Sequence, residues 1–211
     1  MKKTILLLVG IMLVYVISAW LRLEYVMTID NIAVMYEDLL ENNKTVTAEN
    51  LYEKTHQYSL VTMIIMALSA LVKVLFFTLV VYVGYYLFAK QSFLDILKAT
   101  VVAESVNVLL SLVAVVNLIW FNPPTSQLDV AVAPLPLASF FDINKLDQWM
   151  VTPLSAMNIF EVLYIVVLSY MLSRNLKQTF GTSCKVVLCS YGVVALLLIS
   201  GSTALTLYAT R

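Results

Sequence analysis

Charged side chains are scarce in this 211-residue chain. They make up 12% of its residues, whereas hydrophobic residues make up 61%. Soluble domains carry about 25% charged residues. Together with a mean hydropathy of +0.89, this shortage excludes an ordinary soluble domain and predicts an integral membrane protein. The formal net charge is zero, so we expect no nucleic-acid partner.

The chain is also poor in the residues that build metal, redox and catalytic sites. Its one histidine, His56, lies in a polar stretch without a Cys or His at ligand spacing. Cys184 and Cys189 are too few for a disulfide framework, and a spacing of five places them on different helix faces. Phosphate-binding loops, dinucleotide fingerprints and nucleophile elbows are absent from the sequence. We therefore expect a non-enzymatic protein without a cofactor or a metal.

Long apolar runs dominate what remains. A helix of about 20 apolar residues crosses a hydrocarbon core ~30 Å thick. The first run follows Lys2 and Lys3 as in a signal peptide, but its length and the bulky Ile17 before Ala19 favour an uncleaved anchor. The sequence thus predicts an all-α integral membrane protein, with residues 1–211 forming one transmembrane domain, a bundle of five transmembrane helices. The expected spans are approximately 4–21, 60–88, 99–121, 151–172 and 186–208.

The distribution of Lys and Arg predicts the orientation of the bundle, because cytoplasmic segments are enriched in both. One side of a five-span chain would carry seven basic residues and one acid, Asp95. The other side, which includes the loops 22–59 and 122–150, would carry five basic and ten acidic residues. The amino terminus is therefore expected inside and the carboxyl terminus outside. The seven inner basic residues are Lys2, Lys3, Lys90, Lys98, Arg174, Lys177 and Lys185.

The expected outer loop 22–59 contains two short helical patterns. Apolar residues recur at helical spacing after a possible cap at Asp30. A second short helix, "TAENLYEK", is expected to be capped by Thr47. The resulting acidic amphipathic hairpin would shield the ends of the spans or bind a partner. The tripeptide "NKT" at 43–45 fits a glycosylation sequon, which matters only in a eukaryotic secretory pathway.

The expected outer loop 122–150 contains an apolar stretch, "VAVAPLPLASFF". Pro134 and Pro136 interrupt it, so it predicts an interfacial or re-entrant segment rather than another span. Phe140, Phe141 and Trp149 are expected at headgroup depth, where aromatic side chains gather.

Three ionisable residues lie inside the predicted spans: Lys73, Glu104 and Glu161. Lys73 and Glu161 are expected near the midplane, whereas Glu104 is shallower. Charges at that depth cost about 2.5–3.5 kcal/mol on insertion scales, so they normally find partners inside the bundle. We expect Lys73 to pair with Glu161.

An amide accompanies each of the two acids. Asn107 follows Glu104 by three residues, and Asn158 precedes Glu161 by three, so each pair would share a helix face. The five residues are predicted to form an intramembrane polar network. Such a network would either fix the packing of the helices or form a proton or ion relay. Histidine is absent from the spans, and Lys73 could neutralise one acid, which favours the packing role.

The second half of the chain resembles the Yip family of five-span membrane proteins, the Ypt/Rab-interacting proteins, and especially its bacterial members. The features that carry this resemblance are "SFLDILKATVVAES" at the start of one span, "NIFEVLYIVVLSYMLS", and "FGTSCK" before the last span, within about residues 90–200. The resemblance implies a multi-pass protein of the bacterial inner (cytoplasmic) membrane. It would act through helix contacts with membrane lipids, with itself as a homo-oligomer or with another membrane protein, in a scaffold or membrane-organising role.

The alternative is a transporter or channel subunit with a polar path through Glu104, Glu161 and Lys73. Five spans are few for a carrier built from two repeated halves, so this function would require a dimer or a second subunit.

Overall fold

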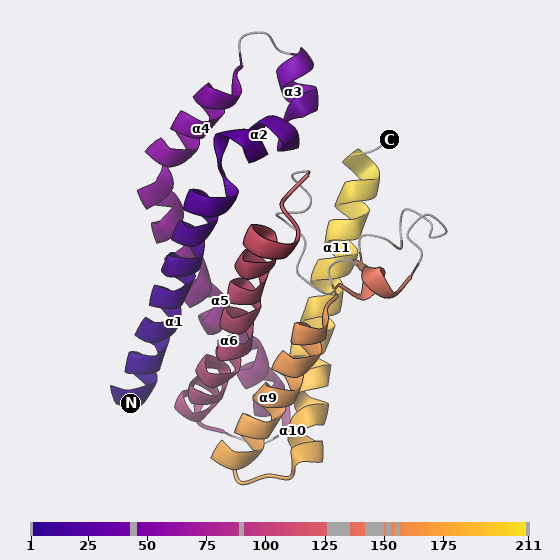
Figure 1. The fold of residues 1–211 in the computed structure, drawn as a ribbon. Coiled ribbons are helices and arrows are strands. Elements are labelled where there is room, and N and C mark those ends of the chain that lie inside the picture. The colour runs from indigo at the N-terminus through magenta and orange to yellow at the C-terminus, as the bar shows by residue number, and fades with distance from the viewer. Residues whose placement is uncertain are drawn as a thin grey trace. The chain divides into compact units, whose positions relative to one another are not determined.

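The computed structural model describes residues 2–42, 46–88, 91–125, 136–141, 150, 153–154 and 157–209. The named elements in this part of the chain are all helices, so the expectation of an all-α protein is confirmed (Figure 1). The sequon at 43–45, Pro134 and Trp149 lie outside the described residues. The elements are α1 (Lys2–Leu21), the π-helix η1 (Arg22–Val26), α2 (Ile29–Met35), α3 (Glu37–Asn42), α4 (Ala48–Gln57), α5 (Ser59–Phe88), α6 (Phe93–Val116), the π-helix η2 (Asn117–Phe121), the 3-10 helix η3 (Leu137–Phe140), α9 (Ile159–Asn175), α10 (Phe180–Val187), the π-helix η5 (Leu188–Gly192) and α11 (Val193–Ala209).

Four helical stretches in the described residues are long and apolar enough to cross a membrane. They are Lys2–Val26, Ser59–Tyr86, Phe93–Phe121 and Phe180–Leu205. The chain is therefore an integral membrane protein, as its composition predicts. The remaining predicted span, 151–172, contains the 17-residue helix α9, which begins only at Ile159.

The chain divides into two compact units, and α5 and α6 contribute to both. The first unit comprises Met1–Leu8, Leu71–Asn107 and Leu135–Arg211. Within it α9 and α10 pack against each other and are joined by a tight turn (Figure 1). In this turn Lys177 has a positive φ of 54°, and the Gln178 N–H donates to the Ser173 carbonyl at 3.0 Å. The Asn175 side chain donates to the Asp95 carbonyl at 3.1 Å, which ties the end of α9 to the start of α6.

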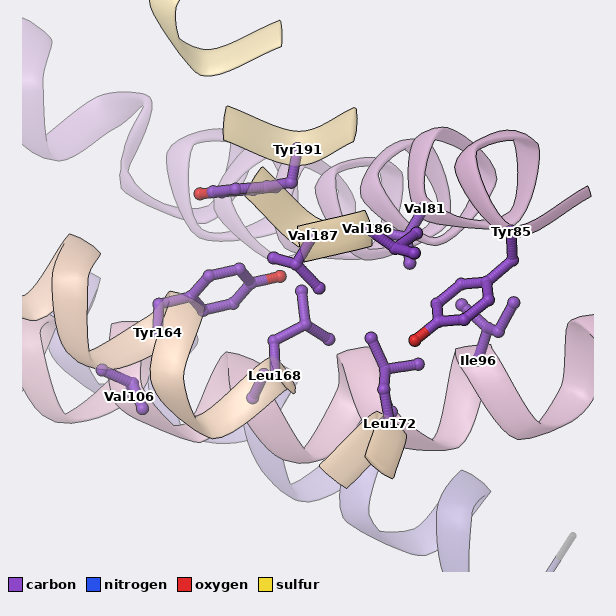
Figure 2. Close-up of a cluster of buried hydrophobic side chains, with 12 residues drawn as sticks. Val81, Tyr85, Ile96, Val106, Tyr164, Leu168, Leu172, Val186, Val187 and Tyr191 are labelled. Atoms are coloured by element: carbon purple, nitrogen blue, oxygen red, sulfur yellow. The ribbon is translucent and has the colours of Figure 1, made fainter. Parts of the chain in front are cut away.

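The core of the first unit is formed by apolar and tyrosine side chains from α5, α6, α9, α10 and η5. Figure 2 shows Leu168 and Leu172 of α9 in the middle of this cluster, with Tyr85 and Tyr164 on either side. Small residues of α6 complete it, because Ala99 and Ala103 are fully buried and allow close packing. The cluster consists of Val81, Tyr85, Ile96, Ala99, Ala103, Val106, Tyr164, Leu168, Leu172, Val186, Val187 and Tyr191.

The second unit comprises Val9–Ala70 and Val108–Pro134. The Ser18 and Ser111 hydroxyls join α1 to α6 through a hydrogen bond of 2.6 Å. The π-helices η1 and η2, which continue these two helices, also pack against each other. Beyond η1 the chain enters α2, which packs on α4 and buries Ile32 and Met35.

The helical prediction for 22–59 is confirmed, with one correction. Thr47 caps α4 as expected, since its side chain accepts a hydrogen bond from the Asn50 N–H at 3.2 Å. The cap of α2 is Thr28 rather than Asp30, because the Thr28 hydroxyl accepts from the Asn31 N–H at 3.3 Å. Asp30 lies in the first turn of α2, where its negative charge favours the helix dipole.

Candidate functional site

A buried carboxylate joins α5 to α6 in the first unit. Glu104 of α6 is completely buried. Its Oε1 atom lies 3.2 Å from the Lys73 ammonium of α5, and its Oε2 accepts a hydrogen bond from the Asn107 side chain at 3.0 Å. The Lys73 side chain keeps 37% of its surface exposed, whereas Glu104 keeps none. Both oxygens of the buried acid therefore have donors, which offsets the cost of burying the charge.

A second carboxylate lies at the beginning of α9. Asn158 is the N-cap of this helix, and its side-chain oxygen accepts from the Glu161 backbone N–H at 3.0 Å. The Glu161 side chain points elsewhere, since its Oε1 accepts a hydrogen bond from the Tyr191 hydroxyl. Glu161 lies in the first turn of α9, where a negative charge interacts favourably with the helix dipole.

The expected pairing of Lys73 with Glu161 is wrong. Lys73 binds Glu104, and the side-chain partner of Glu161 is Tyr191. The expectation that Glu104 and Asn107 share a helix face and interact is correct, because the two side chains are hydrogen-bonded. For Asn158 and Glu161 the reason for the spacing differs: Asn158 precedes the helix and caps its backbone.

Two tyrosines missing from the sequence prediction lie near the two carboxylates. The rings of Tyr164 and Tyr191 are 5.1 Å apart, and Tyr191 also lies 4.6 Å from the Phe77 ring of α5. Both tyrosines are close enough to Glu104 and Glu161 to interact electrostatically with each. Among the described residues the Tyr164 hydroxyl has no hydrogen-bond partner, although it is fully buried. In Figure 2 it points toward Val187.

The π-helix η5 brings Tyr191 into this position. A π-turn widens the helix locally and is often found at functional sites. It presents Tyr191 to Glu161 of α9, while the preceding Ser190 packs against Gly84 of α5. A Cβ atom on Gly84 would lie 2.7 Å from the Ser190 Cβ, so the two helices touch at this glycine.

Glu161 and Asn158 also border a pocket of about 260 Å³ between α9, η5 and α11. The other lining residues are apolar and include Leu137 of η3. The Leu137 N–H donates to the Met157 carbonyl at 2.8 Å, so this part of the predicted interfacial segment packs beside the start of α9. Phe140 and Phe141 are exposed. The remaining lining residues are Met157, Val162, Ile165, Leu188, Gly192, Ala195, Leu196 and Ile199.

The structure offers no metal site in the part of the chain that it describes. Three or more His, Cys, Asp or Glu residues do not come together there at ligand distance. Cys184 and Cys189 are both free thiols.

Comparison with known proteins adds no relative: no protein-family model, curated protein or solved structure matches the chain.

We expect Tyr191→Phe to destabilise the protein by about 1.5–3 kcal/mol, because it removes a hydrogen bond to a charged group. Tyr164→Phe is the matched control. It removes a buried hydroxyl that has no partner among the described residues, so it should be neutral or stabilising. Thermal unfolding in detergent checks both variants. Equal losses in the two would contradict the assigned hydrogen bond.

Proposed function

We propose that the protein is a non-enzymatic, multi-pass membrane protein of the Yip type that acts through helix contacts. Its partners would be membrane lipids, another membrane protein or a second copy of itself, in a scaffold or membrane-organising role. The observation that carries this proposal is the completely buried Glu104, whose two oxygens are occupied by Lys73 and Asn107. A carboxylate held in this way stabilises a helix bundle and is poorly placed to release or accept ions.

The outer faces of the helices supply the surface for such contacts. Large apolar side chains are exposed along α1, α5 and α11. In a membrane such faces lie against lipid or against a neighbouring helix. On α5 they include Leu60, Ile64, Ile65, Leu68, Val72, Leu75, Phe76, Leu79 and Val83.

We further propose five spans, with α9 as the fourth, and an inside amino terminus in a bacterial cytoplasmic membrane. The 17 residues of α9 extend about 25 Å at 1.5 Å per residue, and spans of about 17 residues occur. The asymmetry of Lys and Arg supports the orientation.

Reporter fusions test this topology. A reporter after Arg211 should read outside, and one inserted between Asn175 and Thr179 should read inside. The same side for both reporters would contradict a span between them and remove the basis for the five-span proposal.

Mass spectrometry tests whether the protein acts through helix contacts, which we call the contact function. For this test the protein is extracted from native membranes in polymer-bounded discs. The proposal predicts a constant ratio of one lipid class or one membrane protein to this chain. It also predicts that this ratio falls when exposed apolar residues of one helix, such as Ile65 and Val72, are replaced by Ala. Discs that hold a single copy of the chain, no second protein and lipids in the proportions of the bulk membrane would contradict it.

A second function, a subunit of a transporter or channel, is favoured by one observation. Glu161 borders a pocket, and the Tyr164 hydroxyl lies near both carboxylates without a hydrogen-bond partner among the described residues. A proton passing between the acids would use these groups. Potential-driven proton uptake into vesicles distinguishes this function from the contact function.

A further inference from the structure

The ion pairs of Lys73 and Lys98 do not include the Glu161 carboxylate, and no described Lys or Arg forms an ion pair with it. Lys73 is paired with Glu104, and Lys98 with Asp95. Tyr191 donates one hydrogen bond to Oε1 of Glu161, and within the described part of the chain Oε2 has no partner. The start of α9 is a favourable place for a negative charge but supplies no counter-ion. A site for a positive charge therefore remains beside Oε2.

The position of this charge determines how a ligand would reach it. Glu161 lies 13 residues before Arg174, the basic residue in the last turn of α9. At 1.5 Å per residue this corresponds to about 20 Å along the helix. With Arg174 at one surface of a hydrocarbon core ~30 Å thick, as in the five-span proposal, the carboxylate lies about 10 Å below the other surface. A cation that reaches it must itself be soluble in the membrane.

The walls of the pocket fit such a ligand. Apart from Glu161 and Asn158, the described lining residues are apolar. Three of them are about half exposed: Val162 at 58%, Leu188 at 48% and Leu196 at 53%. The pocket therefore opens on the side of the helices that faces lipid, and apolar groups can enter it from the bilayer.

We propose that this pocket binds a lipophilic organic cation. Its apolar groups contact Val162, Leu188 and Leu196, and its positive charge lies against Glu161. The pocket of about 260 Å³ limits the ligand to a compact cation or to the head of a longer amphiphile. The assignment rests on contacts within the first unit and on the proposal that α9 crosses the membrane, and it does not depend on the proposed partners.

Binding of benzyltrimethylammonium to the full chain in phosphatidylcholine nanodiscs tests the proposal. The neutral comparison is neopentylbenzene, which has the same shape with carbon in place of nitrogen. We expect saturable binding of the cation, with the neutral compound at least about tenfold weaker, since 1.4 kcal/mol of ion pairing corresponds to a factor of ten. Empty discs give the background from partitioning into lipid.

Two variants probe the two halves of the site separately. Glu161→Gln should weaken cation binding by at least about tenfold and leave the neutral compound unaffected. Gly192→Leu keeps the carboxylate but fills the pocket, and its Cβ would make only an ordinary van der Waals contact, 3.8 Å from Leu188, so the start of the new side chain fits. It should abolish binding of both compounds. Asp95→Asn, which removes an equal charge from an ion pair outside the pocket, should bind like the wild type.

Thermal unfolding of each variant in the same discs shows which ones are folded. If Glu161→Gln does not fold, Gly192→Leu alone still decides the proposal. Equal affinity for the cation and its neutral isostere would overturn the proposal, and so would unchanged cation binding in either variant.

Discussion

Replacing Lys73 by Met is expected to lower the free energy of unfolding by about 3–5 kcal/mol, because it leaves a buried carboxylate without its cation. Glu104 is completely buried, and in the variant its Oε1 atom would lose the Lys73 ammonium while Oε2 keeps the Asn107 amide. Met has a similar length, so the variant removes the charge with little change in packing. Chemical or thermal unfolding in detergent, at one pH and one lipid content, measures the loss.

The double variant Lys73→Met with Glu104→Gln should recover much of this loss, because both charges are then gone. A second double variant, Lys73→Met with Glu161→Gln, is the matched control. Its two losses should add, since Glu161 binds Tyr191 rather than Lys73. The opposite result would show that Lys73 binds Glu161 instead of Glu104. In that case the stability losses of Lys73→Met and Glu104→Gln would add, whereas Glu161→Gln would recover part of the loss caused by Lys73→Met.

Gly84→Ala is expected to destabilise the protein by about 1–3 kcal/mol, because it overpacks the contact between α5 and η5. The added Cβ would lie 2.7 Å from the Ser190 Cβ and 3.4 Å from a methyl carbon of Val186. The Ser190 Cβ is attached directly to the backbone, so the helices would have to move apart. Thermal unfolding of the purified variant measures the effect.

Gly192→Ala is the control for the change of residue type. A Cβ there would lie 3.8 Å from Leu188, an ordinary van der Waals contact, so the change should be neutral or slightly stabilising. Combining Gly84→Ala with Ser190→Gly removes the atom that clashes and should restore part of the lost stability. If Gly84→Ala proved as harmless as Gly192→Ala, the close contact of the helices would be contradicted.

The sequence was sufficient to predict the class of the protein and most helix boundaries. Apolar runs determine where a helix can lie in lipid, so the ends of α1 at Leu21, α5 at Phe88 and η2 at Phe121 agree with the predicted spans. Hydropathy does not predict where a helix begins or ends when the helix extends beyond the apolar run. For this reason α6 begins at Phe93, six residues before the predicted span at 99.

The start of α9 was predicted too early because an apolar run does not mark a cap. The predicted span begins at Val151, whereas the helix begins at Ile159 after the N-cap Asn158. The spacing of Asn158 and Glu161 matches the first and last positions of a capping box. This signal was in the sequence, but it was interpreted as two polar side chains on one helix face.

The partners of the buried charges could not be predicted from depth alone. Lys73 and Glu161 have similar expected depths, yet which helix faces which depends on the rotation of each helix and on the packing of distant segments. Tyr191 was missed because tyrosine in a span is usually counted as an aromatic residue. Its position in the predicted span 186–208, opposite an acid in the preceding span, is a signal that could have marked it as a donor to Glu161.

Proton flux into vesicles containing the purified protein tests most directly whether the buried polar residues hold the helices together or conduct protons across the membrane. With a potential imposed by potassium and valinomycin, a pH-sensitive dye inside the vesicles should report the same proton uptake as in protein-free vesicles. This result is expected for the wild type and for Glu161→Gln. Uptake by the wild type that disappears in a folded Glu161→Gln variant would contradict the contact function and support the transport subunit.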